Sequence, residues 1–176
     1  MIRKAALALS ALFLAFLAIG LLLPGEIRVQ RSIEIAAPPE TVFPLVDDLR
    51  EFNRWSPWQA AGVDFSFSGP ESGVGARMVW TEPDGRPGGS QEVVASQPPR
   101  RVVYGLEFGP RGGAEASMEL ESSPLGTRVT WGFDYRVGYD MVGRYIGALT
   151  QGRVGEQYAL GLTRLKALAE TGEARP

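Results

Sequence analysis

The sequence predicts an α+β domain in which a curved antiparallel sheet packs against a long C-terminal helix. Apolar and polar residues alternate in a series of short stretches between residues 26 and 136, which is typical of half-buried strands. The spacing of apolar residues then changes to three and four over 154–169, which predicts a helix. Clean alternation indicates an antiparallel sheet with one solvated face, and strands that follow one another without helices exclude a doubly wound parallel fold.

An uncharged, strongly apolar segment covers residues 5–23 and is followed by Pro24-Gly25. A helix of that length spans roughly 28 Å, close to the hydrocarbon thickness of a bilayer. We therefore expect residues 1–25 to form a membrane anchor with an N-terminal transmembrane helix. A cleaved signal peptide is the alternative, which the basic start suits, although the apolar part of such a peptide has about 7–15 residues.

Basic residues on the two sides of this segment bear on its orientation. Arg3 and Lys4 precede it and favour a cytoplasmic N-terminus, while Arg28 and Arg31 follow it and partly offset that preference. We expect a single-pass membrane protein whose domain lies on the extracytoplasmic side.

The first part of the domain predicts one strand and two short helices. Residues 26–36 alternate, with Arg31 on the same face as the isoleucines, so that this arginine is either paired inside or marks a bulge. The prolines at 38–39 turn the chain into a short helix that ends at Asp47-Asp48, and residues 49–55 suggest a second one. Pro57 then ends helicity, because it disfavours the α conformation at Ser56.

Six further strands are expected, separated by turns rich in glycine and proline. The polar stretch 90–97 predicts an edge strand or a curved one. The alternating apolar positions fall within 63–67, 74–80, 90–97, 102–108, 114–120 and 129–135.

The C-terminal part predicts a helix with one apolar face, formed by Val154, Tyr158, Leu162, Leu165 and Ala169. Residues 139–149 suggest a shorter helix before it, with glycines at 147, 152 and 155 loosening the join. The polar residues 171–176 predict a flexible tail. The domain should therefore cover residues 26–170.

A strand, two short helices, six strands and a long helix is the order of the helix-grip layout, and four segments add a family resemblance. RSIEIAAPPETVFPLVDDLREFNRWSPW resembles the opening of the polyketide cyclase/dehydrase and lipid-transport family, in the START-like (SRPBCC) superfamily that includes the birch-pollen allergen. SGPESGVGARMVW, GTRVTWGFDY and GLTRLKALAE resemble its second and third strands, last strand and C-terminal helix. The resemblance covers about residues 28–170 and implies a seven-stranded sheet curved around the long helix.

The resemblance also implies a gap between the sheet and the helix. Side chains on the concave face then form either a filled core or a binding cavity, and about 300 Å³ or more of free volume would indicate a cavity. Met141, Tyr145, Val154 and Tyr158 would close it from the helical side. Trp55 and Trp58 would lie at its mouth, as a gate or as anchors of the short helices. The candidate ligand-binding residues are Trp55, Trp58, Phe65, Phe67, Met78, Trp80, Tyr104, Leu106, Met118, Trp131, Phe133, Tyr135, Tyr145 and Tyr158.

Composition excludes several chemistries. The chain has no histidine and no cysteine, which excludes Ser-His-Asp hydrolysis, HExxH and facial-triad metal sites and thiolate catalysis. A net charge of −2 gives no electrostatic footprint for nucleic acid. We expect no metal and no cofactor, and no residue stands out as catalytic.

Three functions remain open from the sequence. The first is binding or transport of a hydrophobic small molecule or lipid in an internal cavity, tethered at a membrane. The second is a polyketide cyclase or aromatase, in which a tyrosine or arginine polarises a carbonyl. The third is a protein-interaction module like the co-chaperone branch of the superfamily, which an exposed apolar groove would favour.

Overall fold

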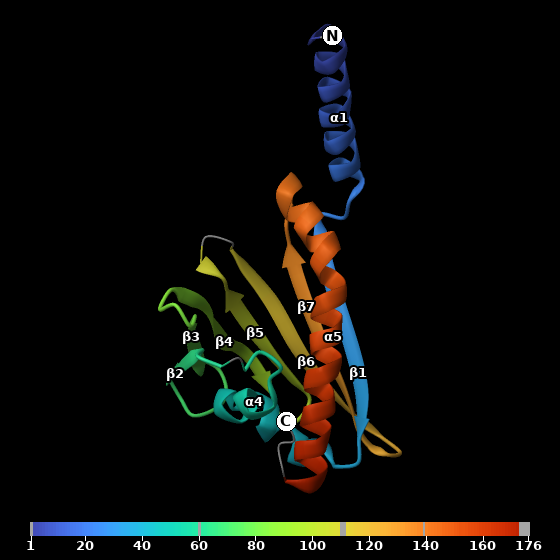
Figure 1. Cartoon of the computed structure of the whole chain (residues 1–176). Coiled ribbons are helices and arrows are strands. Elements are labelled where there is room, and N and C mark those ends of the chain that lie inside the picture. Colours follow the sequence, from blue (N-terminus) through green and yellow to red (C-terminus); the bar gives the residue numbers. More distant parts are fainter. Residues whose placement is uncertain (1, 60, 110–111, 139, 173–176) are drawn as a thin grey trace.

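A single seven-stranded sheet with one long helix along it forms the body of the protein (Figure 1). The computed structural model describes residues 2–59, 61–109, 112–138 and 140–172. Every strand pair is antiparallel, in the order β1-β7-β6-β5-β4-β3-β2. The predicted α+β class and helix-grip layout are therefore confirmed. The strands are β1 (Glu26–Ile35), β2 (Asp64–Ser68), β3 (Arg77–Thr81), β4 (Pro87–Gln97), β5 (Arg101–Glu107), β6 (Gly113–Ser123) and β7 (Gly126–Arg136).

Three short helices follow β1, where two were predicted, because Pro44 starts a second helix within the first predicted one. One long helix comes last, as predicted. They are α1 (Ile2–Leu22), α2 (Pro39–Val42), α3 (Pro44–Asp47), α4 (Leu49–Trp55) and α5 (Met141–Thr171). Asp48 starts α4 because its carboxylate accepts a hydrogen bond from the Arg50 amide at 2.7 Å. Asp47 is buried and accepts a hydrogen bond from the Ser96 hydroxyl at 2.7 Å, which fixes α3 to β4.

The stretch 90–97 is curved and does not lie at an edge, so the edge-strand alternative is wrong. β4 pairs with β3 on one side and with β5 on the other, and the edges of the sheet are β1 and β2. Register shifts occur between Val93 and Ala95 and between Trp80 and Thr81. Such bulges bend and twist a strand, which helps the sheet to curve around its helix.

α5 is one continuous helix, so the prediction of a separate helix over 139–149 is wrong (residue 139 itself lies outside the described residues). The glycines that suggested a loose join instead permit close packing. A Cβ at Gly147 would lie 2.0 Å from Ile27 Cδ1, and one at Gly155 would lie 2.2 Å from Arg31 Nη2. The helix therefore lies close to β1 at these glycines, and a larger residue at either one would require Ile27 or Arg31 to move.

Arg31 faces α5 but is exposed, and the predicted internal ion pair is not formed. Its guanidinium donates a hydrogen bond to the Gln30 carbonyl at 2.7 Å. The register of β1 with β7 runs without a shift past this residue, so there is no bulge here either. An exposed guanidinium needs no buried carboxylate partner.

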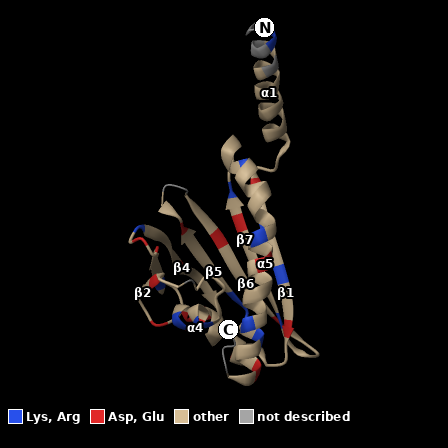
Figure 2. Ribbon diagram, viewed as in Figure 1, with Lys and Arg blue, Asp and Glu red and all other residues tan. Residues whose placement is uncertain are grey.

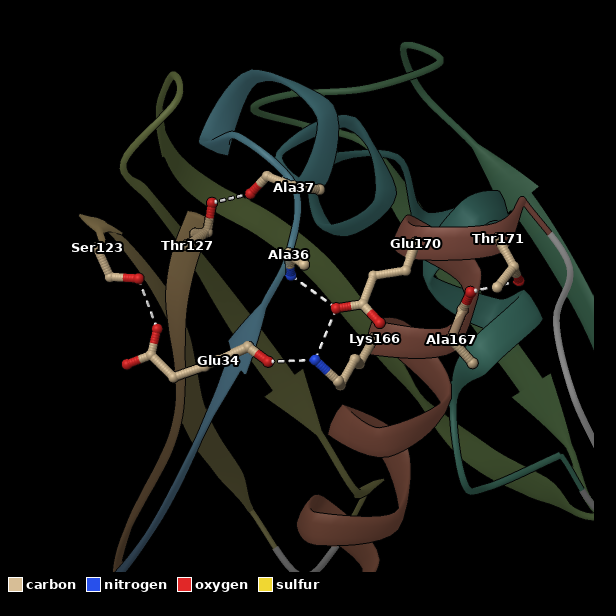
Figure 3. Close-up of polar contacts among 9 residues, drawn as sticks. All are labelled: Glu34, Ala36, Ala37, Ser123, Thr127, Lys166, Ala167, Glu170 and Thr171. Atoms are coloured by element: carbon tan, nitrogen blue, oxygen red, sulfur yellow. Dashed lines mark hydrogen bonds and ion pairs between the residues drawn. The ribbon is translucent and has the colours of Figure 1, made fainter. Parts of the chain in front are cut away.

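The C-terminal end of α5 is fixed to β1 by a small polar cluster (Figure 3). The Lys166 ammonium donates to the Glu34 carbonyl at 2.7 Å and to the Glu170 carboxylate at 2.6 Å. The same carboxylate accepts a hydrogen bond from the Ala36 amide at 2.6 Å. Lys166 and Glu170 thus satisfy backbone groups at the end of β1, where no sheet partner is available.

The N-terminal segment is helical, as predicted, and α1 projects away from the sheet beyond the start of α5 (Figure 1). Figure 2 shows α1 free of charged side chains after its basic first turn. Arg144 donates to the carbonyls of Gly20, Leu21 and Leu23 at 3.1–3.2 Å, which satisfies acceptors at the end of α1. Within the described residues, no helix is both long enough and apolar enough to cross a membrane. The expected transmembrane span is therefore not confirmed.

The two ends of the chain were predicted to be a flexible tail and an anchor or signal peptide. The tail was placed at 171–176, of which residues 173–176 lie outside the part that the structure describes. The choice between a retained anchor and a cleaved signal peptide is not addressed by the fold.

We predict that Glu170→Gln weakens the acid dependence of stability. Hydrogen bonds from Lys166 and, second, from the Ala36 amide lower the pKa of Glu170. Because the folded-state pKa lies below the unfolded value, the stabilisation is present at neutral pH and is lost as pH falls through about 5 to 3. Thermal unfolding should show the variant below wild type by about 2 °C at pH 7, with the difference vanishing near pH 3.

Glu156→Gln is the matched control, since Glu156 is exposed on the same helix and has no ion pair among the described residues. Its melting curve should follow that of wild type at every pH. Parallel wild-type and Glu170→Gln profiles would contradict the role of Glu170.

Candidate functional site

The concave face of the sheet and two helices border a partly open cavity of about 460 Å³, which exceeds the roughly 300 Å³ that would indicate a binding site. β2 to β7 contribute the floor, α4 and the segment after it one wall, and α5 the opposite wall. Most of the lining is apolar or aromatic. The lining residues are Phe52, Ser56, Trp58, Val63, Phe65, Met78, Trp80, Glu82, Gly88, Gln91, Tyr104, Leu106, Phe108, Ala116, Trp131, Phe133, Val154 and Tyr158.

Strand register explains how residues distant in sequence meet on this floor. Directly paired residues on neighbouring strands point to the same face of a sheet. One row crosses the floor through Met78, Gln91 and Leu106. A second row runs through Tyr104, Ala116 and Phe133. Ala116 is the smallest member of its row, so the space between its two aromatic neighbours stays open.

Trp131 is the centre of an aromatic cluster at one end of the cavity. Its ring stacks on Tyr158 of α5, with centroids 3.8 Å apart and planes 15° from parallel. Phe52, Trp55 and Trp58 contact it edge-on at 5.3–5.7 Å. This geometry suits ring quadrupoles and joins α4, β7 and α5 into one packed unit.

Two tyrosines line the cavity with neutral phenols. The Tyr104 hydroxyl donates to the Val46 carbonyl at 2.6 Å, which ties α3 to the sheet. Burial raises the pKa of Tyr104 well above its ordinary value. Burial, and then the negative charge of Asp134, also raise the pKa of Tyr158. Both phenols therefore remain protonated at neutral pH.

Many of the sequence-predicted ligand residues line the cavity, although ligand contact itself stays a prediction. Those in the lining are Trp58, Phe65, Met78, Trp80, Tyr104, Leu106, Trp131, Phe133 and Tyr158. Val154, expected to close the cavity from the helical side, also lines it.

The remaining candidates lie elsewhere. Trp55 is fully buried and its indole donates to the Leu45 carbonyl at 2.8 Å, which fits the anchor alternative. Met118 is buried in the core. Phe67 packs on the core beneath the Arg50 guanidinium, 5.1 Å from its ring centroid. Tyr135 is half-buried on β7 and is not in the lining.

Tyr145 and Met141 contact α1 and do not line the cavity. Tyr145 stacks on Phe16 at 4.5 Å and donates its hydroxyl to the Phe16 carbonyl at 2.7 Å. Met141 Sδ lies 2.7 Å from where a Cβ at Gly20 would be. The long helix extends past the sheet, so its first turns meet α1 and lie away from the concave face (Figure 1).

Sequence reasoning missed several lining residues. Phe52 and Ser56 come from the short-helix region, and Gln91 from a strand whose polarity suggested an edge. Gln91 is two residues from Val93 in β4, so alternation could have placed both on the same face. It was missed because only apolar residues were used to identify the concave face. The other residues missed are Val63, Glu82, Gly88, Phe108 and Ala116.

The fold and the cavity define the class: a helix-grip protein with an apolar interior between sheet and long helix. The sequence model of the family described as polyketide cyclase / dehydrase and lipid transport matches residues 26–170, and this chain belongs to that family. No protein with curated annotation matches the sequence significantly.

Solved structures share the fold at low sequence identity. A protein from Rhodobacter sphaeroides is 21% identical with a TM-score of 0.61, over 81% of this chain and 91% of that one. The Aha1 dimer from Colwellia psychrerythraea is 20% identical with a TM-score of 0.59, over 84% and 98%. A protein of the dynemicin biosynthetic locus is 20% identical with a TM-score of 0.58, over 84% of this chain and 48% of that one.

We predict that Gly161→Ala destabilises the protein by disturbing the Trp131 cluster. A Cβ at Gly161 would lie 2.8 Å from Trp131 Cζ3 and 3.0 Å from Pro57 Cδ, and neither ring can move freely. Overpacking of this kind costs about 1–3 kcal/mol, which exceeds the roughly 1 kcal/mol gained in helix propensity. Differential scanning calorimetry should show a lower Tm.

Gly152→Ala is the matched control on the same helix, because nothing lies within 4 Å of its Cβ position. It should raise the Tm through helix propensity alone. If both variants shift the Tm in the same direction, close packing at Gly161 is not the reason for its glycine.

Proposed function

We propose that this protein binds a small hydrophobic molecule in the cavity between its sheet and α5. The observation that carries the proposal is the cavity itself, about 460 Å³ within a mainly apolar lining. Volumes and linings of this kind are typical of small-molecule sites. Aromatic and methionine side chains such as Trp80, Phe133 and Met78 adapt to apolar ligands and supply large contact areas.

The ionisable groups around the cavity favour a ligand-binding function over a catalytic one. Glu82, Tyr104 and Tyr158 are the ionisable side chains among the described lining residues. Both phenols have raised pKa values and so cannot serve as general bases near neutral pH. In the described residues, no three or more acidic side chains are arranged to hold a metal ion. The cyclase alternative would depend on a neutral tyrosine polarising a carbonyl.

We predict that Ala116→Phe abolishes ligand binding by filling the cavity. The neutral dye N-phenylnaphthylamine should accept energy from Trp58, Trp80 and Trp131, all of which line the site. Wild-type protein should show saturable dye fluorescence on tryptophan excitation. The added ring lies between Tyr104 and Phe133, so the apparent Kd should rise at least about tenfold.

Ala159→Phe makes the same change at an exposed position on α5 and should leave the Kd unaltered. Thermal unfolding of both variants separates loss of the cavity from loss of the fold. Saturable binding that survives in a folded Ala116→Phe protein would place the dye outside the cavity and oppose the proposal.

We further propose that the domain is held beside a lipid bilayer through α1. Support comes from the uncharged segment 5–23 and from apolar side chains that remain exposed. Val142, Ile146 and Leu149 extend this exposed apolar surface onto the start of α5. On α1, the exposed apolar side chains include Leu7, Leu9, Leu12, Phe13, Leu14, Phe16, Ile19, Leu21 and Leu22.

We predict that the full chain floats with phosphatidylcholine vesicles on a density gradient, and that Phe13→Arg reduces the floating fraction. A charge at this position opposes burial in hydrocarbon by about 2.5–3.5 kcal/mol. Leu125→Arg is the matched control, since Leu125 is equally exposed but lies in the β6–β7 turn at the opposite end of the sheet (Figure 1). Wild-type protein that stays at the bottom of the gradient would refute the bilayer proposal and leave the cavity proposal intact.

A further inference from the structure

Three strands and the start of the long helix meet at one end of the sheet, the end where β1 begins, which we call the α1 end. β1 pairs antiparallel with β7 from Glu26 and Arg136 onwards, and every other strand pair is also antiparallel. β3, β5 and β7 therefore all run towards the α1 end. α5 starts there as well, because the amides of Val137 and Gly138, just before it, donate to the Gly25 carbonyl at 3.0 and 3.1 Å.

Exposure of the cavity lining rises towards the α1 end. In each of the three strands, a buried lining residue is followed, two positions nearer that end, by a half-buried one. α5 shows the same change, since Tyr158 is buried and Val154, about one turn nearer the start of the helix, is half-buried. The buried strand residues are Met78, Tyr104 and Trp131, and the half-buried ones are Trp80, Leu106 and Phe133. The cavity therefore opens towards the α1 end.

α1 leaves the domain at the same end and is held against it. Only residues 23–25 join α1 to β1, and this connection spans at most about 14 Å. Tyr145 of α5 stacks on Phe16 of α1, and the Arg144 guanidinium donates to carbonyls at the end of α1. Since α1 projects beyond the α1 end (Figure 1), a bilayer that holds α1 would lie across the opening of the cavity.

An apolar stripe on the first turns of α5 lies at this end too. Val142, Ile146 and Leu149 follow the helix period, and they are 59%, 55% and 79% exposed. Exposed apolar side chains gathered on one surface indicate a contact with another molecule or a membrane. Because the stripe continues the exposed apolar surface of α1, the boundary between headgroups and hydrocarbon is the partner that would cover both.

The lining indicates an uncharged ligand. Glu82 is the only charged side chain among the described lining residues, so no arginine or lysine lines the cavity there. A phosphate or carboxylate would be desolvated without a cationic partner. Uncharged apolar molecules dissolve in hydrocarbon, and each CH₂ group that they move into water costs about 0.8 kcal/mol. An opening on the bilayer surface would spare the ligand that transfer.

We infer that the α1 end of the domain rests on the bilayer surface, and that the cavity takes its ligand, an uncharged apolar molecule, directly from the lipid. The inference rests on both proposed functions, the cavity as a binding site and α1 as the attachment to a bilayer. Exposed charged residues at this end, such as Asp64 and Glu107, would lie among the headgroups, which add about 5–8 Å on each side of the hydrocarbon.

Single-cysteine labelling of the full chain tests the orientation, since the sequence has no cysteine. A fluorophore at Glu107→Cys lies at the end of β5 beside the opening, and one at Leu125→Cys lies at the opposite end of the sheet. In protein that has floated with phosphatidylcholine vesicles, a nitroxide on the lipid headgroup should quench the first fluorophore and spare the second. Equal quenching at both positions, or none at either, would overturn the inference.

The apolar stripe has a readout of its own. The environment-sensitive dye NBD at Ile146→Cys should shift its emission to the blue when vesicles are added, because its surroundings become apolar. Leu160→Cys is the matched control on the same helix, since Leu160 is 42% exposed and lies about four turns further along. An unshifted spectrum at position 146 in floated protein would count against the bilayer contact of α5.

Diphenylhexatriene tests the source of the ligand, because it is uncharged and resides in bilayers. It accepts energy from tryptophan, and Trp58, Trp80 and Trp131 line the cavity. In vesicles that contain this dye, wild-type protein should lose more of its tryptophan emission than Ala116→Phe does. The filled variant measures the energy transfer to dye that remains in the bilayer.

The two dyes separate the inference from the proposals beneath it. If wild-type protein and Ala116→Phe respond alike to diphenylhexatriene while wild type binds N-phenylnaphthylamine, the lipid source is refuted and the cavity proposal stands. If wild type binds neither dye, the cavity proposal fails as well.

Discussion

The close approach of α5 to the edge strand β1 is the constraint on which the cavity depends. The helix packs mainly on β1 and makes far less contact with the rest of the sheet. Gly147 and Gly155 allow this approach because side chains there would overlap Ile27 and Arg31. The helix lies along the β1 edge of the sheet, and the sheet curves beyond it. The part of the concave face towards β2 therefore has no long helix packed on it. The short helices cover part of that face, and the remaining space is the cavity.

The interior is accordingly packed at one end and open at the other. Near the β6–β7 turn, Leu120 and Val129 pair on the sheet, and Leu165 and Leu168 of α5 belong to the same buried core. The Trp131–Tyr158 stack closes this packed end. Beyond it, the floor carries Ala116 and Gln91 where a filled core would carry large apolar side chains. Large aromatics therefore surround the space and do not occupy it.

Local periodicity was sufficient to predict the strands, the long helix and many lining residues, because alternation in β3, β5 and β7 places Met78, Tyr104 and Phe133 on one face. It could not predict which rows face open space, since Met118 and Trp131 pair directly, yet only Trp131 lines the cavity. Tyr145 follows the helix period but lies beyond the sheet and meets α1. The continuity of α5 was missed for a physical reason as well: glycines disfavour a helix locally, but Gly147 and Gly155 lie where the helix packs closely on Ile27 and Arg31.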